Sequence, residues 1–357
     1  MDLRARRAPR QTRGEFDPVL ATKGTKGAKQ KINLCLLCLF VANANIRLMA
    51  QGIAESVLDL IGQTPLLHLS RFAKPPLADI YAKIEWLNPG GSVKDRAALG
   101  MILDAEERGL LKAGATIIEP TAGNTGIGLA LVGVARGYRV ILCVPRGFAE
   151  EKMKLIEALG GEIEYVSHEA GMQGAIDRCH ELTASIDGSF VPQQFENNAN
   201  PCFHEQTTAR EIIQQMNGEI DAVVIGAGTS GTFCGVSRAM RKQNRHVLCV
   251  LVEPEGSIYG GGPPGPKKIE GIGQRDFIPK IFDASLADEI LMVQDDEVCT
   301  ALKKIAKLEG LLGGWSTGAA AAASYKIAER LGPGKRVVTV FPDGAERYRS
   351  QGIFDES

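Results

Sequence analysis

The chain has 357 residues, which at about 150 residues per domain is enough for two lobes, each with a sizeable core. Lysine and arginine total 41 and aspartate and glutamate total 42, so the formal net charge is −1. This balance leaves no bulk electrostatic attraction for nucleic acid, and we exclude that class of partner. No apolar run reaches the ~18 residues that a membrane-spanning helix needs, so no membrane partner is predicted.

The first 52 residues differ in composition from the rest of the chain. A basic stretch over 4–31 leads into an apolar stretch over 34–44, a combination with some features of a signal or transit segment. The basic part is longer than the basic start of a signal peptide, however, and it contains acidic residues that are unusual in a transit peptide. We therefore predict a poorly ordered extension over 1–52 and a folded domain over 53–357.

Eight cysteines are scattered mostly within apolar segments, at positions 35, 38, 143, 179, 202, 234, 249 and 299. This distribution predicts reduced, buried thiols in a cytoplasmic protein. Cys35 and Cys38 have the CxxC spacing of many metal and redox sites, but the residues between them are apolar and no second pair follows. No metal site is predicted.

Strand-like and helix-like segments alternate from Gly52 onward. Predicted strands cover 66–69, 79–86, 115–119, 139–145, 162–166, 190–193, 221–225, 246–253 and 336–341. Predicted helices cover 93–108, 127–136, 150–159, 171–186, 201–216, 232–242, 295–309 and 316–331. The alternation predicts an α/β fold of two lobes, each with a mostly parallel sheet flanked by helices. Ligands in such folds bind at the carboxyl ends of the strands, where the loops described next are expected.

Residues 88–96 read Asn-Pro-Gly-Gly-Ser-Val-Lys-Asp-Arg and join a predicted strand to a predicted helix. Proline and glycine are typical of a turn, and Ser92 three residues before Asp95 predicts a capping-box-like helix start. Lys94 then lies in the first helical turn, where the positive end of the helix dipole disfavours a cation. That field lowers the pKa of Lys94 and makes the free amine available as a nucleophile. The alternative is a solvated surface lysine.

Residues 226–232 read Gly-Ala-Gly-Thr-Ser-Gly-Thr, between a predicted strand and a predicted helix. Backbone N–H groups at a helix N-terminus, together with three hydroxyl side chains, predict a phosphate site. The loop also matches G-x-G-x-x-G, with Glu253 22 residues after Gly231 at the end of the next predicted strand. A dinucleotide site, and with it an NAD-dependent oxidoreductase built on Gly226–Gly231, is therefore one hypothesis.

Two other glycine-rich loops open predicted helices. Residues 121–126 read Thr-Ala-Gly-Asn-Thr-Gly, and their hydroxyl and N–H groups suit a substrate carboxylate. Asn124 could reach a phenolic oxygen on a cofactor, or cap the helix. In the Gly-Gly-Trp-Ser-Thr-Gly loop over 313–318, Ser316 taken alone is predicted to be an ordinary helix N-cap.

Together these motifs resemble the fold-type II pyridoxal-phosphate (PLP) enzymes of the cysteine synthase and cystathionine β-synthase family. The resemblance runs from about Ser56 to Ile353, with several motifs in the family's order. It implies a tryptophan synthase β-like fold, with a smaller lobe over approximately 92–200 and a larger lobe over approximately 53–91 and 201–354. It also implies PLP as the cofactor and a homodimer.

The resemblance implies roles for individual residues. Lys94 is the implied catalytic residue and holds PLP as an imine, Asn124 lies beside the cofactor's O3′, and Ser316 faces its pyridine nitrogen. The phosphate is implied to bind at Gly228, Thr229, Ser230, Gly231 and Thr232. The amino-acid substrate is implied to bind at Thr121, Ala122, Gly123, Thr125, Gln194 and Gly273. The segment 341–348 is similar to a further family signature, which carries no role in this prediction.

The implied reaction is β-replacement on an activated serine, O-acetylserine, through an aminoacrylate, with sulfide as the acceptor and cysteine as the product. Ser316 is a neutral partner for the ring nitrogen, and a weaker electron sink favours prompt loss of a β leaving group over transamination or racemisation. Lobe closure over the substrate carboxylate would shield the reaction from water.

Several departures from the family pattern leave the specificity open. Ala122 stands where the family often has serine, and Ser230 replaces a glycine of the phosphate loop. The stretch 169–176 is similar to members that accept homocysteine, so cystathionine synthesis from homocysteine is an alternative. Serine and O-phosphoserine are alternative donors. A PLP-fold protein that scaffolds a partner enzyme without turnover is a hypothesis from a different class.

Overall fold

The computed structural model describes residues 52–147, 150–244 and 246–354. Apart from Gly52, the predicted N-terminal extension lies outside these described residues, and so does the Cys35/Cys38 pair. No helix within the described ranges is both long and apolar enough to cross a membrane.

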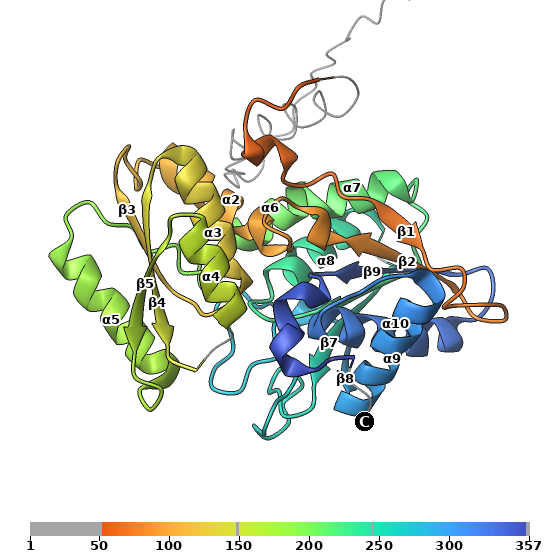
Figure 1. The fold of residues 1–357 in the computed structure, drawn as a ribbon. Helices are drawn as coiled ribbons and strands as arrows, with labels where there is room; N and C mark the ends of the chain where they lie inside the picture. Colours follow the sequence, from red (N-terminus) through yellow and green to blue (C-terminus); the bar gives the residue numbers. More distant parts are fainter. Residues whose placement is uncertain (1–51, 148–149, 245, 355–357) are drawn as a thin grey trace, which may run out of the picture. The chain divides into compact units, whose positions relative to one another are not determined.

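Six strands form the larger of two sheets, in the order β1-β2-β9-β6-β7-β8 (Figure 1). The neighbours from β2 to β8 pair in parallel, whereas β1 pairs antiparallel with β2 at one edge. In β7 and β9 every residue after the first is buried, which is typical of parallel strands covered on both faces. The strands are β1 (Leu66–His68), β2 (Asp79–Ile84), β6 (Ala222–Gly226), β7 (Leu248–Pro254), β8 (Glu289–Val293) and β9 (Arg336–Phe341).

The second sheet contains β3 (Thr116–Pro120), β4 (Arg139–Pro145) and β5 (Glu162–Val166), all paired in parallel. Three helices follow its strands in turn, α3 (Asn124–Arg136), α4 (Glu150–Ala158) and α5 (Gly171–Ser185). Both sheets are thus largely parallel and flanked by helices, which confirms the predicted α/β class. The boundaries of the two lobes stay a prediction.

Four helices, which flank the two sheets, pack against one another in series. α2 (Lys94–Glu107) packs against α3 and α6 (Ala199–Gln206), and α6 packs against α8 (Gly231–Gln243). Glycine makes these contacts possible, because a Cβ at Gly100 would lie 2.4 Å from Phe203 Cβ and one at Gly235 would lie 2.4 Å from the carbonyl oxygen of Pro201. The remaining helices are α7 (Thr208–Gln215), α9 (Asp295–Glu309) and α10 (Trp315–Leu331), with 3-10 turns η1 (Val57–Leu60), η2 (Glu85–Leu87), η3 (Ala284–Leu286) and η4 (Ala345–Gln351).

The apolar cores lie between each sheet and its helices. β9, β6 and β7 pack against α10 and share a core of buried alanine, valine and isoleucine side chains. A separate core lies between α2, α3 and the strands β3 and β4. The carboxyl ends of β3, β6 and β9 lead directly into the three loops over 121–123, 227–230 and 342–344. These are the strand ends at which ligands bind in open α/β sheets.

The predicted strand over 190–193 is wrong. Only Phe190 pairs with the sheet, through one bridge to Ile117 in which its N–H donates to Thr116 and its carbonyl accepts from Ile118. Gln193 then takes a φ of +56°, in the left-handed region, which a strand residue cannot adopt. The chain therefore turns away from the sheet after a single pair.

Two further predictions differ from the structure. The predicted helix over 201–216 is divided into α6 and α7 at Thr207, whose hydroxyl donates to the carbonyl of Phe203 at 2.7 Å. Such back-bonding by threonine competes with the helix ladder and bends helices. Strand β8 was not predicted, although residues 290–293 are all apolar; it lies at the edge of the sheet, pairs only with β7, and is mostly half-buried.

Candidate active site

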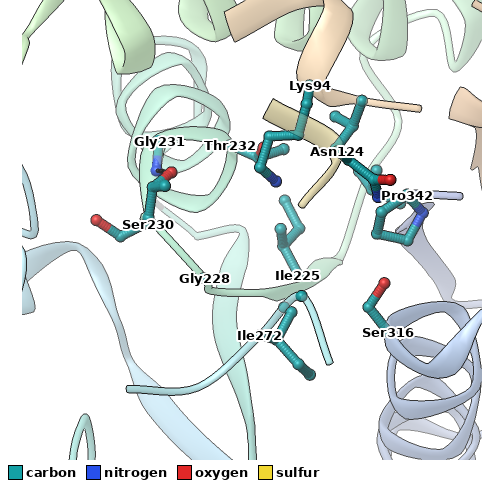
Figure 2. Close-up of a pocket in the computed structure, with 15 residues that line it drawn as sticks. Lys94, Asn124, Ile225, Gly228, Ser230, Gly231, Thr232, Ile272, Ser316 and Pro342 are labelled. Carbon is teal, nitrogen blue, oxygen red and sulfur yellow. Dashed lines mark hydrogen bonds between the residues drawn. The ribbon is translucent and has the colours of Figure 1, made fainter. Parts of the chain in front are cut away.

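A cavity opens where the loops after β6 and β9 meet the N-termini of α2, α3, α8 and α10. Figure 2 shows Lys94 entering it from α2, the 228–232 loop on one side, and Asn124 and Ser316 on the opposite side. All eight residues that the sequence analysis assigned to the cofactor line this cavity: Lys94, Asn124, Gly228, Thr229, Ser230, Gly231, Thr232 and Ser316.

Lys94 is the first residue of α2 and extends into the cavity. Burial is the largest influence on its pKa and lowers it, while the negative charge of Asp343 raises it by a smaller amount. Within the ranges that the structure describes, no carboxylate or carbonyl accepts a hydrogen bond from the Lys94 amine. The neutral, nucleophilic form of the amine is therefore favoured, mainly by desolvation, whereas the sequence argument relied on the helix dipole.

The predicted capping box at the start of α2 is wrong. The Ser92 hydroxyl accepts from the Lys94 N–H at 3.2 Å, but the Asp95 carboxylate does not accept a hydrogen bond from the Ser92 N–H, as a capping box requires. Its Oδ2 instead accepts from the Gly90 N–H at 2.6 Å. A Cβ at Gly90 would lie 2.5 Å from Asp95 Oδ1, so only glycine lets the backbone approach this carboxylate. Asp95 thereby fixes the turn that precedes Lys94.

The loop after β6 presents backbone N–H groups to the cavity at the N-terminus of α8. Gly231 N–H donates to the Thr229 hydroxyl at 3.3 Å, whereas the N–H groups of Thr229, Ser230 and Thr232 donate to no group in the described part of the chain. Ser230 has a φ of +69°, and Figure 2 shows its hydroxyl directed away from the Lys94 amine. The backbone, more than the Ser230 side chain, therefore offers hydrogen-bond donors that suit an anion.

The Thr232 hydroxyl lies 3.3 Å from Nε2 of His204, a buried residue of α6. Nδ1 of the same ring lies 2.8 Å from the Thr208 hydroxyl. Burial lowers the pKa of His204 well below its usual value, so the imidazole is neutral. A neutral ring with Nε2 protonated donates to the Thr232 oxygen and leaves the Thr232 hydroxyl proton for a phosphate.

Asn124 and Ser316 share a partner on the other side of the cavity. Asn124 Nδ2 donates to Asp343 Oδ2 at 2.7 Å, and the Ser316 hydroxyl donates to Asp343 Oδ1 at 3.4 Å. Neither is a helix N-cap, because Gly123 and Gly314 occupy those positions. Asn124 and Ser316 both line the cavity, and Asp343 fixes both side chains there.

Asp343 is the residue of this site that the sequence analysis missed. It is 1% exposed and also accepts from the hydroxyl of Tyr348. The only signal was the resemblance of the segment 341–348 to a family signature. Arg347, from the same segment, donates to Asn124 Oδ1 at 2.7 Å and to the Gly90 carbonyl. The segment after β9 therefore holds the start of α3 and the turn before Lys94 together.

None of the six residues assigned to the substrate lines this cavity, although five of them lie in or beside the segment that follows β3. Thr121, Ala122 and Gly123 immediately precede Asn124, and the Thr125 hydroxyl donates to Gln194 Oε1 at 2.6 Å. Gly273 lies apart from these five. Its N–H donates to the Ala227 carbonyl at 2.7 Å, and a Cβ there would lie 2.7 Å from Pro254.

Glu253 does not fit the ribose-binding role that a dinucleotide site requires. Its two carboxylate oxygens accept the N–H groups of Tyr259 and Gly260, each at 3.0 Å. The side chain is 5% exposed. Its hydrogen-bonding capacity is thus directed to the loop after β7, which argues against the oxidoreductase hypothesis.

The family model described as "Pyridoxal-phosphate dependent enzyme" matches residues 57–343. The chain belongs to this family. PLP is therefore the cofactor of this enzyme, and the NAD-dependent alternative is set aside. The family match includes the loops and helix N-termini around the cavity, from the turn before Lys94 to Asp343.

Named relatives agree with the family match. The enzyme is 44% identical over 308 residues to a cysteine synthase of Staphylococcus aureus (strain Mu50 / ATCC 700699), covering 86% of this chain and 99% of the relative. It is 43% identical over 303 residues to the O-acetylserine dependent cystathionine beta-synthase of Bacillus subtilis (strain 168), covering 85% and 98%. The crystal structure of the O-acetylserine dependent cystathionine beta-synthase from Helicobacter pylori superposes with a TM-score of 0.80 at 42% identity, covering 85% and 100%.

The residues around the cavity fit PLP. Lys94 offers a deeply placed amine that makes no ion pair with any described residue, which suits an aldehyde carbon. The N–H groups of Thr229, Ser230 and Thr232, around the start of α8, are unpaired with the described chain and suit a phosphate. Both features line one cavity (Figure 2), so a single molecule that carries both groups satisfies both.

Proposed function

We propose that the enzyme catalyses β-replacement on O-acetylserine, with sulfide as the acceptor and cysteine and acetate as the products. The observation that carries this proposal is the Lys94 amine, which burial keeps nucleophilic beside an anion-binding loop and a neutral hydroxyl, Ser316. The names of the Staphylococcus aureus and Bacillus subtilis relatives, a cysteine synthase and an O-acetylserine dependent enzyme, support the reaction and the donor.

The residues that would hold PLP come from both sides of the cavity. Lys94 Nζ holds the cofactor covalently, and the phosphate binds to the N–H groups and hydroxyls of the 228–232 loop. Asn124 and Ser316 face the ring from the opposite side. When bound, PLP supplies the electron sink for the bond electrons released at the substrate's Cα.

Lys94 is proposed to move the proton during the reaction. With PLP and the substrate bound, the free Nζ of Lys94 would accept the Cα proton, and acetate would leave from Cβ. After the sulfur of the acceptor bonds to Cβ, the protonated amine returns its proton to Cα. Because burial lowers the pKa of Lys94, the neutral base is more available than in a solvated lysine, and the charge of Asp343 supports the protonated form that follows.

The loop after β3 is proposed to bind the substrate's carboxylate. Thr121, Ala122, Gly123 and Thr125 offer N–H and hydroxyl donors at the start of α3, where the helix dipole favours an anion. Gln194 lies beside them through its bond with Thr125. Gly273 is retained as a substrate residue on the family resemblance alone.

Homocysteine is the second candidate acceptor, with cystathionine as the product. The Bacillus subtilis and Helicobacter pylori relatives, whose names join O-acetylserine with cystathionine synthesis, favour this candidate. The resemblance of residues 169–176 to homocysteine-accepting members favours it further. Both acceptors use the same donor steps, so the two candidates differ only in the reaction at Cβ.

The proposal extends to the organisation of the protein. We propose a catalytic domain over 53–357 that assembles as a homodimer in the cytoplasm, with a smaller lobe near 92–200 and the remainder in the larger lobe. The division of the strands into two sheets supports the lobes. Light scattering on the purified protein tests the dimer, and a monomer mass at micromolar concentration would contradict it.

A donor-by-acceptor panel tests the proposed reaction. Holoenzyme is incubated with O-acetylserine, serine or O-phosphoserine, each with sulfide or homocysteine, and the products are identified by mass. Cysteine from O-acetylserine and sulfide is the expected product. Cystathionine formed in preference to cysteine would move the assignment to the second candidate, and no product with any pair would favour a scaffolding role.

A further inference from the structure

Glu119 is a buried carboxylate at the end of β3 that the proposed reaction does not use. It is 1% exposed. Its Oε2 accepts the N–H of Gln193 at 2.9 Å, and its Oε1 accepts the N–H of Gln194 at 3.1 Å. Two successive backbone N–H groups, 74 and 75 residues farther along the chain, are thus held by one side chain.

No cation pairs with Glu119 in the described ranges. Burial raises the pKa of its carboxyl to about 7, and the bonds from the Gln194 and Gln193 N–H groups lower it. A buried carboxylate without a counter-ion is costly, and only its hydrogen bonds offset that cost. The two N–H groups are therefore what this carboxylate is placed to hold.

The segment over 193–194, which Glu119 binds, has an unusual backbone conformation. Gln193 has a φ of +56°, which is uncommon for a residue other than glycine and strains the backbone. This left-handed turn directs the chain from Phe190, at the edge of β3, to Gln194. Glu119 accepts on both sides of the turn, so it stabilises the strained conformation.

The other polar groups of Gln194 are also fixed. Its Oε1 accepts from the Thr125 hydroxyl at 2.6 Å, and its carbonyl accepts from Asn200 Nδ2 at 2.9 Å. The same Asn200 Nδ2 donates to the Thr229 hydroxyl in the 228–232 loop at 3.1 Å. Among the described residues, nothing accepts from Gln194 Nε2. The amide is thus oriented with its NH2 group free to donate, next to the loop proposed to bind the substrate's carboxylate.

We propose that Glu119 is a positioning residue for the amino-acid substrate, which fixes the backbone of residues 193–194 so that the Gln194 amide donates to the substrate's carboxylate. The inference rests on the proposed function, which places that carboxylate at Thr121–Thr125. Glu119 lies two residues before Thr121 on the same strand end, so one element carries the carboxylate loop and anchors the residue that faces it.

The test compares Glu119→Gln with wild-type holoenzyme. An amide of the same size offers one acceptor and one donor, so one of the two N–H groups loses its partner and faces an NH2 group. We expect the KM for O-acetylserine to rise about tenfold or more, with kcat and the dissociation constant of PLP changed less than about threefold. The matched control is Glu164→Gln on β5, whose carboxylate is 40% exposed and should leave the KM unchanged.

A double-mutant cycle separates positioning from a general loss of structure. Gln194→Ala should raise the KM for O-acetylserine, and adding Glu119→Gln should raise it little further, because Glu119 acts through Gln194. Independent, additive increases would overturn the inference. So would an unchanged KM in Glu119→Gln, or equal losses in KM, kcat and PLP affinity.

Two outcomes keep the inference separate from the proposed function. Turnover of O-acetylserine by the wild type, combined with an unchanged KM in Glu119→Gln, overturns the inference alone. If the wild type does not turn over O-acetylserine, the proposed function fails. The dissociation constant of L-serine from holoenzyme, measured by the change in cofactor absorbance, then replaces the KM in the comparison of Glu119→Gln with the wild type. If Glu119→Gln does not fold, Glu119→Asp carries the test, and an unchanged KM in that variant overturns the inference.

Discussion

Asn124 at the start of α3 donates its side-chain amide to Asp343, just beyond the end of β9, across 2.7 Å and 219 positions of sequence. The same carboxylate accepts from Ser316 at the start of α10. Asp343 therefore ties together the two groups proposed to face the ring of PLP, and it lies close enough to Lys94 to influence its pKa. One buried carboxylate thus links the proposed electron sink to the proposed base.

Asp343→Asn should lower the pKa of Lys94 further. The negative charge of Asp343 raises that pKa against the larger lowering by burial, so its removal leaves desolvation less opposed. Only the neutral amine is expected to react with PLP. The fall in the rate of PLP binding on the acid side of the pH profile should therefore occur at lower pH in the variant. The measurement is the growth of the visible absorbance of bound PLP in apoenzyme as a function of pH. Glu346→Gln, at an exposed neighbouring position, is the control, and a limb that stays or moves to higher pH would contradict the expectation.

Lys94→Ala should abolish the visible absorbance band of bound PLP and reduce turnover by several orders of magnitude, because the covalent and acid–base roles are lost together. Borohydride treatment of the wild type, followed by peptide mapping, should place the modification at Lys94. Lys112→Ala, at an exposed lysine, should retain the band. A wild-type protein that stays colourless after reconstitution with PLP, or a trapped modification elsewhere, would contradict the assignment.

Strong local signals allowed much of the fold to be predicted. β4, β5, β9 and α9 have the predicted bounds. α9 has sharp ends because a capping box joins Gln294 to Glu297 and Gly310 adopts the left-handed conformation after its last residue. The edge strand β8 and the break at Thr207 lack such signals, because pairing with one neighbour and one side-chain bond to a carbonyl leave no periodic pattern.

In the candidate site, too, some features could be predicted from the sequence and others could not. Loops that open helices could be predicted one by one, since glycine, hydroxyl and lysine residues at strand ends have a local chemical meaning. Contacts between segments that are distant in the sequence could not be predicted. Glu119 reads as one more residue of a buried strand and Asp343 as a turn residue, and their partners stand 75 and 219 positions away. Only the folded chain shows that each carboxylate holds a residue of the site.

Thr232→Ala should weaken the retention of PLP by about 1–3 kcal/mol, the range of a hydrogen bond to a charged group. Thr232 lines the cavity, and its hydroxyl lies 3.3 Å from the neutral His204 ring, which can donate to it and leave its proton for the proposed phosphate. Thr232→Ser keeps the hydroxyl and should keep most of the affinity. The measurement is the dissociation constant of PLP by equilibrium titration of apoenzyme, and an unchanged constant in the alanine variant would argue against a phosphate at this loop.

Arg96→Lys should destabilise the protein by about 3–5 kcal/mol, because it breaks a buried charge network. The Arg96 guanidinium is fully buried, with Nε 2.7 Å from Glu85 and Nη1 2.6 Å from Glu211. Lysine cannot satisfy both carboxylates with forked hydrogen bonds. Arg139→Lys is the matched control, since its pairing with Glu162 is about half exposed and is expected to contribute less than about 1 kcal/mol. Equal shifts of the urea unfolding midpoint in the two variants would contradict the expectation.

Asp95→Asn should make the stability of the protein less dependent on pH. Burial raises the pKa of Asp95 from 3.8 to about 7, although the Gly90 N–H and the nearby arginine charges lower it. The folded state therefore binds the proton more tightly than the unfolded state does. Its contribution to stability is complete below pH ~4 and is lost as the pH rises toward 7.

Asparagine removes this titration while keeping an oxygen for the Gly90 N–H. The free energy of unfolding of the variant, relative to that of the wild type, should therefore increase by a few kcal/mol between pH ~4 and pH ~8. Urea unfolding of both proteins across that range measures the difference, and Asp104→Asn, at a half-exposed aspartate of the same helix, is the control. A relative stability that is flat, or that falls with rising pH, would show that Asp95 ionises in the folded protein as easily as in the unfolded chain.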